Sequence, residues 1–297
     1  FLDYFQKNKI RHLGIEPSKN VATISKSKNI NTINSFFNNV SAKNIIKNFG
    51  YVDIFYSANV MCHIPNIKQL SMNIKKVLKP NGMLIFEDPY LGDIVNKCSY
   101  DQIYDEHVFL FSLHSVKNIF KNVGMTLVDV EKINTHGGSM RYFIKNSNNA
   151  KVSSKVKINL KKEVNIGITS ISGLKKLSNK IHKSKRELLE LLNKLRKEGK
   201  KVAGYAATSK STTSLNFCNI KKNLITYIND TTPLKINKFS PGMHIPIKSY
   251  DYSKKNIPDY YFLFAWNHID EILKKEKNFL KRGGKFITHI PNVRIIK

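Results

Sequence analysis

The stretch that decides the fold reads DIFYSANVMCHI at residues 53–64. Its first half is an apolar run of strand length, and its second half brings an amide, a thiol and an imidazole directly after the run. Open parallel α/β sheets bind ligands at the carboxyl ends of their strands, where polar groups of this kind gather. The stretch therefore predicts a strand of a doubly wound sheet that ends at a ligand site.

Short apolar runs and amphipathic stretches alternate on both sides of this stretch, over residues 1–145. The pattern predicts strands at residues 10–15, 53–58, 83–87, 125–130 and 139–144, helices at residues 1–8 and 67–78, and a turn at residues 80–82. Strands that alternate with helices in this way are typical of a parallel α/β sheet.

The second half repeats the alternation after a polar segment at residues 145–150, which we interpret as a linker. Leucines recur at helical spacing from Leu174 to Leu195, and Gly199 stands where a helix-ending glycine belongs. Strands are expected at residues 202–207, 224–228, 261–266 and 286–290, with a helix at residues 270–280. The sequence thus predicts two Rossmann-like doubly wound α/β domains, residues 1–145 and 146–297.

Composition limits the class of protein. The chain has 297 residues, about two domains' worth, and its apolar share of 41% is that of a globular protein. The 50 basic against 21 acidic residues give a net charge of +29, which raises nucleic acid as a partner. However, only six of the basic residues are Arg and the lysines are spread along the chain, so we expect no nucleic-acid partner. A positive field can still attract a phosphorylated small molecule.

The spacing of the cysteines indicates the cellular compartment in which the protein works. Cys62, Cys98 and Cys218 lie far apart and form no CxxC pair, so the sequence encodes neither a disulfide framework nor a cysteine zinc site. We expect a reducing cytoplasm and no metal in this chain. No apolar run reaches the roughly 18 residues that a membrane-spanning helix needs, so we expect no membrane partner. The oligomeric state stays open.

Glu16 is the first candidate for ligand binding. It follows the predicted strand at residues 10–15, and a carboxylate at such a strand end can accept hydrogen bonds from both ribose hydroxyls of a nucleoside cofactor. The alternative is an ordinary exposed carboxylate at a strand end.

Ionisable side chains are densest at residues 101–107, DQIYDEH. Tyr104, Glu106 and His107 supply a phenol, a carboxylate and an imidazole, which can act as a general base, a group that orients it, and a donor to a developing oxyanion. His63 follows the strand at residues 53–58 and can join them. The alternatives are a charged, solvated loop and a structural histidine.

Two glycine- or hydroxyl-rich turns complete the candidates. His136 and Arg141 flank the pair Gly137 and Gly138, whose backbone permits close approach of a ligand; an ordinary hairpin turn is the alternative. Residues 204–213, GYAATSKSTT, form a strand-to-helix turn in which Lys210 and the hydroxyls can hold a phosphate. Helix capping alone explains this turn equally well.

A series of motifs resembles one enzyme family. The motifs are GIEPSKNVA (14–22), NVMCHI (59–64), LKPNGMLIFEDPYL (78–91), DQIYDEH (101–107), THGGSMR (135–141), GYAATSKSTT (204–213), DTTPLKINKFSPGMHIPI (230–247), FAWNHIDEI (264–272) and GGKFITHIPNV (283–293). In this order they resemble the S-adenosylmethionine-dependent sugar C-methyltransferases, which methylate C3 of nucleotide-linked 4-keto-deoxy sugars. The resemblance covers nearly the whole chain.

The resemblance implies roles for the residues that match the family's motifs. Glu16 is similar to the family's ribose ligand of S-adenosylmethionine, and Asn59 and Val60 match the segment that lines the methionine part of the cofactor pocket. In the family's Tyr-x-Glu-His motif, His107 matches the general base, beside Tyr104 and Glu106, and His63 matches a second active-site histidine. The C-terminal half is similar to the family's second Rossmann-like domain.

That second domain helps to hold the nucleotide-sugar, so we expect Lys210 and Lys235 to meet its phosphates or to line the cleft between the domains, and His136 and Arg141 to contact the substrate. The family usually opens with a small zinc module carrying CxxC pairs, followed by a first strand and a glycine-rich loop. We expect this chain to be truncated before those elements, with zinc confined to the preceding module.

The residues fit carbon methylation chemically. A proton next to a ketone is acidic enough for a neutral imidazole to remove, and the negative charge that builds on the ketone oxygen can be stabilised by Tyr104 or His63. No catalytic metal is needed. The alternatives are a methyltransferase that acts on oxygen or nitrogen of another small molecule, a nucleic-acid-binding protein, and a catalytically silent fragment.

Overall fold

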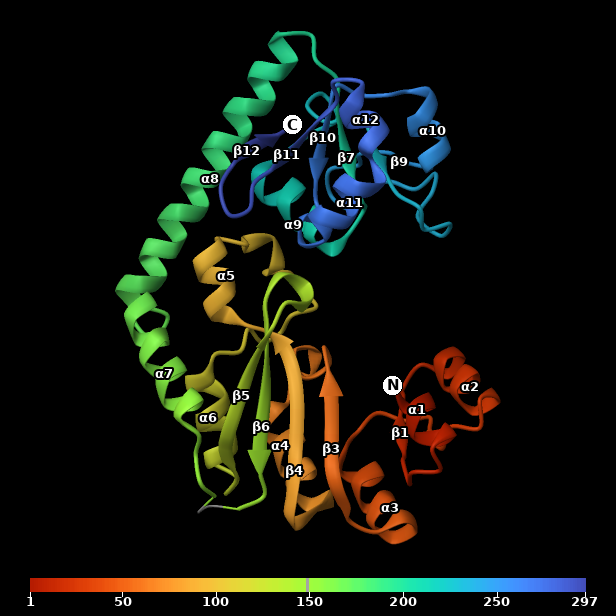
Figure 1. Ribbon diagram of the computed structural model, residues 1–297, viewed down its shortest axis with the longest axis vertical. Coiled ribbons are helices and arrows are strands. Elements are labelled where there is room, and N and C mark those ends of the chain that lie inside the picture. The colour runs from red at the N-terminus through yellow and green to blue at the C-terminus, as the bar shows by residue number, and fades with distance from the viewer. Residues whose placement is uncertain (148–149) are drawn as a thin grey trace.

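The computed structural model describes residues 1–147 and 150–297 and has the α/β class that the sequence predicts. Two sheets with flanking helices lie one beyond the other along the molecule, and one long helix, α8 (Ile171–Lys197), runs alongside and connects them (Figure 1). The N-terminal segment lies at one side of the first sheet. The described residues include no helix long and apolar enough to cross a membrane.

The first sheet, here called the N-terminal sheet, has the strand order β3-β4-β6-β5. Its strands are β3 (Val52–Ala58), β4 (Leu78–Pro89), β5 (Thr126–Ile133) and β6 (Ser139–Lys145). β3 and β4 are parallel, whereas β6 is antiparallel to both β4 and β5. The sheet is therefore mixed and not wholly parallel as predicted, because a short turn joins β5 to β6 and can only connect antiparallel strands.

The C-terminal sheet has the order β12-β11-β10-β7-β8-β9 and is parallel except for β12. Its strands are β7 (Val202–Tyr205), β8 (Ile228–Asn229), β9 (Ile247–Lys248), β10 (Tyr260–Leu263), β11 (Lys285–Thr288) and β12 (Arg294–Ile296). A separate pair, β1 (Gly14–Ile15) and β2 (Thr32–Ile33), forms a small parallel sheet in the N-terminal segment.

Helices cover these sheets and carry the connections between strands. The remaining α-helices are α1 (Leu2–Lys7), α2 (Lys19–Ser27), α3 (Asn39–Phe49), α4 (Ile67–Val77), α5 (Leu91–Lys97), α6 (Leu113–Lys121), α7 (Ser154–Ile166), α9 (Ser209–Cys218), α10 (Tyr250–Lys255), α11 (Ile269–Lys275) and α12 (Lys277–Lys281). Short 3₁₀ turns are η1 (Met61–His63), η2 (Tyr100–Gln102), η3 (Thr135–Gly137) and η4 (Trp266–His268).

Most predicted elements are confirmed to within a few residues, but several differ. The predicted strands at residues 10–15 and 224–228 shorten to the two-residue strands β1 and β8, and β1 pairs with β2 outside the N-terminal sheet. The helix predicted at residues 270–280 is divided into α11 and α12. The predicted turn at residues 80–82 lies inside β4, where the register with β3 jumps from the pair Val52–Leu78 to the pair Ile54–Met83. The extra residues are thus absorbed as a bulge within the strand.

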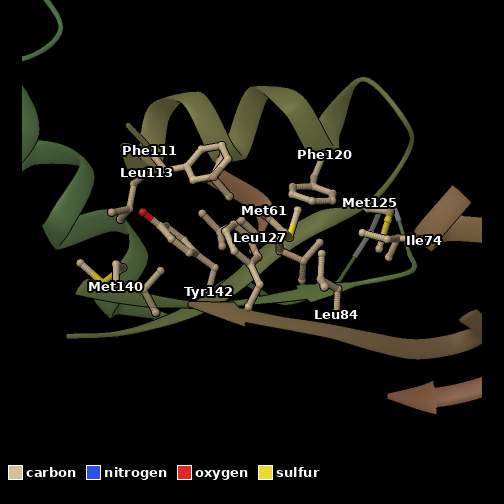
Figure 2. Close-up of a cluster of buried hydrophobic side chains, with 14 of the residues drawn as sticks. Met61, Ile74, Leu84, Phe111, Leu113, Phe120, Met125, Leu127, Met140 and Tyr142 are labelled. Atoms are coloured by element: carbon tan, nitrogen blue, oxygen red, sulfur yellow. The ribbon is translucent and has the colours of Figure 1, made fainter. Parts of the chain in front are cut away.

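The N-terminal sheet owes its stability to a core between its inner face and helices α4 and α6. Phe86 and Tyr142, on neighbouring strands, stack with ring centroids 4.7 Å apart, and Phe86 also contacts Phe111 and Phe120. All four side chains are at least 98% buried. Figure 2 shows Tyr142, Phe111 and Phe120 within this core. This packing fixes the strand ends from which the candidate site residues project.

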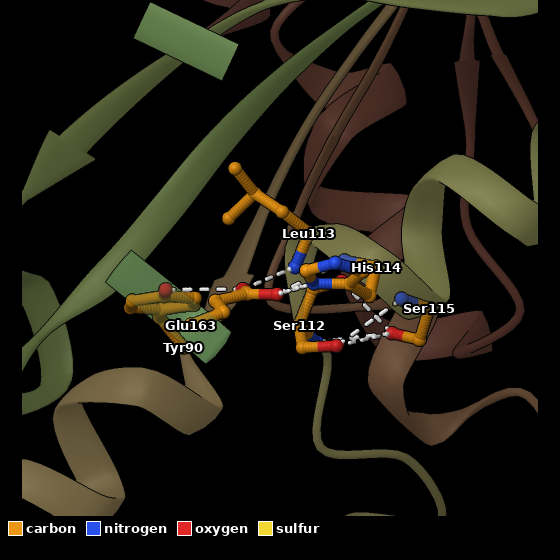
Figure 3. Close-up of polar contacts among 6 residues, drawn as sticks. All are labelled: Tyr90, Ser112, Leu113, His114, Ser115 and Glu163. Atoms are coloured by element: carbon orange, nitrogen blue, oxygen red, sulfur yellow. Dashed lines mark hydrogen bonds and ion pairs between the residues drawn. The ribbon is translucent and has the colours of Figure 1, made fainter. Parts of the chain in front are cut away.

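Helix α7 fastens the segment after residue 150 to this same sheet. Its Glu163, wholly buried, accepts hydrogen bonds from the backbone N–H groups of Leu113 (2.6 Å) and His114 (3.1 Å) at the start of α6, and from the Tyr90 hydroxyl (3.0 Å) (Figure 3). The predicted linker at residues 145–150 lies partly outside the described residues. The predicted domain boundary follows the end of β6, although α7 beyond it packs on the N-terminal sheet.

Candidate active site

His107 ends a compact loop that follows η2. Its Nδ1 lies 2.9 Å from the carbonyl oxygen of Gln102, and its backbone N–H donates to the carbonyl of Tyr104 at 2.9 Å. A carbonyl oxygen only accepts, so Nδ1 carries the proton and Nε2 keeps its lone pair. Burial lowers the pKa of His107, which favours the neutral ring. The loop therefore holds His107 in the form that a general base requires.

His63 and Tyr104 converge on His107. His63 lies at the end of η1, directly after β3, and its Nδ1 contacts the carbonyl oxygen of Glu106. The ring centroid of His107 lies 5.2 Å from that of His63 and 4.0 Å from that of Tyr104. The structure thus brings together residues that the sequence places on two separate segments. Their catalytic roles stay a prediction.

Tyr104 and Glu106, the polar residues beside His107, differ in how far their side chains are exposed. Burial first, and then the Glu106 carboxylate, raise the pKa of Tyr104 to about 12. Its hydroxyl therefore keeps its proton at neutral pH and can donate a hydrogen bond. The Glu106 side chain is exposed, while its backbone carbonyl holds His63.

The residues expected to hold the cofactor lie at two strand ends. Glu16 follows β1, and one of its carboxylate oxygens accepts the Ser18 backbone N–H at 2.7 Å. Asn59 follows β3 in a left-handed conformation (φ 54°), and its buried Oδ1 has no hydrogen-bond partner among the described residues. Val60 beside it is 48% exposed. Glu16 and Asn59 each supply a hydrogen-bond acceptor of the kind that a nucleoside cofactor uses, but Glu16 follows the small β1–β2 sheet and Asn59 the N-terminal sheet, so their joint role stays a prediction.

A cavity of about 640 Å³ lies between the C-terminal sheet and the loop at residues 103–107, here called the Tyr104 loop. Tyr104, Asp105 and Glu106 form one wall. The opposite wall combines the start of α9 with the segment from Leu234 to Pro241. Because α9 follows β7, the cavity lies at the carboxyl end of the C-terminal sheet, where α/β sheets bind ligands.

The two candidate lysines occupy different places. Lys235 lines the cavity, and its Nζ donates to the carbonyl oxygen of Ala207 at 2.7 Å. Lys210 is 8% exposed and does not line the cavity; its Nζ donates to Asn267 at 2.8 Å and lies 5.0 Å from the ring centroid of Trp266. Burial lowers the pKa of Lys210. Only Lys235 is therefore poised at the cavity in this conformation.

His136 and Arg141, the two residues expected to contact the substrate, also lie in different environments. His136 in η3 is near Lys210, and burial first, then the Lys210 charge, lower the pKa of His136. Arg141 on β6 forms ion pairs with Glu87 (2.8 Å) and Glu131 (2.9 Å), its cross-strand neighbours. The structure thus commits the Arg141 guanidinium to two carboxylates, and its contact with substrate stays a prediction.

Sequence reasoning missed the contact between the two sheets. The Nε1–H of Trp266 donates to Oδ2 of Asp101 at 2.6 Å, and Nε2 of His289 lies 3.5 Å from the same oxygen. Asp101 and His289 are completely buried. The Trp266 ring also packs so closely on Gly137 that a Cβ there would collide with it. Asp101 begins the motif DQIYDEH and Trp266 lies in the motif FAWNHIDEI, but nothing in the sequence indicates that residues so far apart are in contact.

Comparisons with known proteins find similar proteins for both halves of the chain. Residues 134–291 match the family model of the C-methyltransferase C-terminal domain, and residues 1–130 match that of a methyltransferase domain. The C-methyltransferase NovU of Streptomyces niveus is 32% identical over 296 residues, which is 99% of this chain and 70% of that protein.

Two solved structures of S-adenosylmethionine-dependent methyltransferases are similar over about half of the chain. The protein from Archaeoglobus fulgidus is 14% identical, with a TM-score of 0.39, and the match covers 49% of this chain and 80% of that one. A possible histamine N-methyltransferase from Thermotoga maritima is 14% identical, with a TM-score of 0.37, covering 48% and 76%. From the family models and the NovU match, the chain belongs to the S-adenosylmethionine-dependent C-methyltransferase family.

Proposed function

We propose that this enzyme methylates C3 of a nucleotide-linked 4-keto-deoxy sugar through an enolate. The observation that carries the proposal is His107, which is held with Nδ1 protonated and Nε2 unprotonated beside the rings of Tyr104 and His63. An unprotonated imidazole nitrogen next to a phenol is the pair of groups that proton removal alpha to a ketone requires.

In this proposal His107 takes the C3 proton on Nε2. Because burial favours its neutral form, the base is available at neutral pH, and a well-placed general base contributes roughly 10²–10⁴ in rate. The hydrogen bond to Gln102 then stabilises the ring as it gains charge, since Nδ1–H points at a carbonyl oxygen.

Tyr104 is the better donor to the enolate oxygen. The contact between Nδ1 of His63 and the carbonyl of Glu106 places the proton of a neutral His63 on Nδ1, so Nε2 has none to give. The Tyr104 hydroxyl keeps its proton, and the Tyr104 ring lies beside that of His107. We therefore assign oxyanion stabilisation to Tyr104 and leave His63 as a neighbour that shapes the pocket.

The cavity supports the substrate class. It joins the Tyr104 loop to the first turn of α9, where Thr208 caps the helix by accepting the Ser211 N–H at 3.1 Å. Backbone N–H groups at a helix start favour phosphate, and Lys235 and Lys238 add positive charge to the same walls. A nucleoside diphosphate held there would place its sugar next to Tyr104, whose ring centroid lies 4.0 Å from that of His107.

Glu16, Asn59 and Val60 are the residues we assign to the cofactor. When bound, S-adenosylmethionine supplies the electrophilic methyl group that the sugar carbanion takes up. We further propose that the partner is this small molecule and not nucleic acid or a membrane, and that the enzyme works in the cytoplasm, in keeping with three free, buried cysteines among the described residues.

Isotope exchange tests the proposal. The full-length enzyme is incubated in deuterated water with nucleotide-linked 4-keto-deoxy sugars and the demethylated cofactor, and deuterium at C3 is measured by NMR. We expect wash-in with wild-type enzyme and none with His107→Ala. An enzyme that methylates oxygen or nitrogen has no reason to exchange this proton, so methyl transfer without exchange contradicts the enolate.

A further inference from the structure

Three potential metal ligands meet at the floor of the candidate site. The donor atoms of Cys62, His63 and His107 all lie within 4.8 Å of one another. Cys62 is 1% exposed and precedes His63 in η1, so one short segment supplies a thiol and an imidazole while the Tyr104 loop supplies the other imidazole. Thiol and imidazole are ligand types that favour Zn²⁺ and similar metals over Mg²⁺ or Ca²⁺.

The two imidazoles are oriented as metal-bound histidines are. Each places its Nδ1 on a backbone carbonyl, His63 on Glu106 and His107 on Gln102, and therefore presents an unprotonated Nε2. In known metal sites the ligating histidine almost always donates its other N–H to such an oxygen, which fixes the ring. Here that outer contact already exists for both rings.

A buried carboxylate supplies the matching charge. Asp88 at the end of β4 is completely buried, and neither of its oxygens has a hydrogen-bond partner among the described residues. Burial first, and then the Asp88 charge, raise the pKa of the Cys62 thiol, so the carboxyl and the thiol lie close together. Burial also raises the pKa of Asp88 to about 6. Zn²⁺, one thiolate and one carboxylate sum to zero net charge, so a bound cation would relieve the cost of burying an uncompensated carboxylate.

We propose that Cys62, His63 and His107 bind Zn²⁺ in a three-ligand site that switches the enzyme off. Binding forms one sulfur–zinc and two nitrogen–zinc bonds; the thiol proton leaves to solvent, and nothing is oxidised or reduced. Tetrahedral zinc with these ligands needs donor atoms about 3.3–3.6 Å apart, so the loop that carries His107 closes by up to about 1.5 Å. Zinc on Nε2 occupies the lone pair needed to remove a proton.

Metal binding is tested without activity, using Co²⁺ as the probe. The full-length enzyme is stripped with a chelator and titrated with Co²⁺ in the absence of oxygen, and the thiolate-to-cobalt charge-transfer band is recorded as the difference between wild type and Cys62→Ala. We expect the band in wild type, its loss in Cys62→Ala, its retention in the control Cys218→Ala, and its disappearance when Zn²⁺ displaces Co²⁺. Identical spectra for wild type and Cys62→Ala overturn the site.

The inhibitory effect, which rests on the proposed role of His107, has its own test. Methyl transfer is measured against Zn²⁺ concentration for wild type and Cys62→Ala. We expect wild type to be inhibited and restored by chelator, and Cys62→Ala to stay active while needing at least about tenfold more Zn²⁺. Equal inhibition of both overturns the proposal. If Cys62→Ala fails to fold, Cys62→Ser keeps the volume and removes the soft ligand. The cobalt spectra remain decisive even if the proposed reaction is wrong.

Discussion

The indole N–H of Trp266 donates a 2.6 Å hydrogen bond to Asp101, across the contact between the two sheets. Asp101 is the residue before Gln102, whose carbonyl oxygen holds Nδ1 of His107. The C-terminal sheet therefore fixes the backbone that orients the proposed base. This relationship shows how a side chain that follows a strand of one sheet can anchor the start of the loop that carries His107 on the other.

Trp266→Phe should lower kcat about tenfold while KM and cofactor affinity change little. Phenylalanine keeps an aromatic ring but removes both the donor and the outer edge of the indole that lies against Gly137. The buried Asp101 carboxylate then lacks this hydrogen bond, a loss of about 1–3 kcal/mol. Steady-state kinetics measure kcat and KM, and titration with the cofactor measures its affinity. Asp101→Asn, which keeps an acceptor for the indole, is the matched control and should retain most activity. A folded Trp266→Phe enzyme with wild-type kcat would refute this positioning role.

His107→Ala should abolish methyl transfer without weakening the binding of S-adenosylmethionine, because His107 is proposed to touch only the sugar. Loss of a general base costs roughly 10²–10⁴ in rate. Single-turnover rates and equilibrium binding provide the two readouts. A variant that keeps more than about a tenth of wild-type kcat argues against His107 as the base.

Tyr104→Phe separates the two candidate donors to the enolate oxygen. Removing the hydroxyl should reduce kcat by about 10²-fold with little change in KM, as for other groups that bind a developing oxyanion. His63→Gln should cost far less, because a neutral His63 has no proton on Nε2. Pre-steady-state methyl transfer compares the two. The reverse order of effects would assign the donor role to His63.

Lys235→Ala should raise KM for the sugar nucleotide about tenfold and leave cofactor affinity unchanged. Its ammonium lines the cavity and is held by the carbonyl of Ala207, so its loss removes a charge-assisted contact of about 1.5–3 kcal/mol. The exposed Lys222 offers a control, since Lys222→Ala makes the same change of charge away from the cavity. Equal effects of the two substitutions would mean that Lys235 acts only through the overall positive charge of the protein and not through a contact with the substrate.

Glu163→Gln should destabilise the protein by about 2–3 kcal/mol, because the Gln side chain has one accepting oxygen, and its NH2 group cannot accept the second of the backbone N–H groups of Leu113 and His114. Urea unfolding followed by circular dichroism measures the change in free energy. Glu190→Gln on the exposed side of α8 is the control. Unchanged stability in Glu163→Gln would mean that α7 is held by its apolar contacts alone.

The sequence identified groups that lie together in the structure. Polar residues after an apolar run predict a site at the edge of a sheet, and His63, which follows β3, lies beside His107 of the ionisable segment at residues 101–107. Arg141 shows the limit of this reasoning: its pairing with Glu87 and Glu131 follows from the antiparallel register of three strands, which periodicity alone does not reveal.

The contact between Trp266 and Asp101 lies beyond sequence reasoning for a different reason. The two residues are 165 positions apart, and each has a satisfactory local interpretation as part of a loop. Only the packing of one sheet against the other brings an indole donor to a buried carboxylate. The cavity walls and the separate environments of Lys210 and Lys235 depend on the same packing.

The position of the new methyl group tests the central claim most directly. The full-length enzyme is given S-adenosylmethionine labelled with carbon-13 in its methyl group together with nucleotide-linked 4-keto-deoxy sugars, and the product is analysed by NMR. The account predicts a labelled methyl carbon bonded to ring carbon C3, next to the ketone. A labelled methyl bonded to oxygen or nitrogen would contradict it.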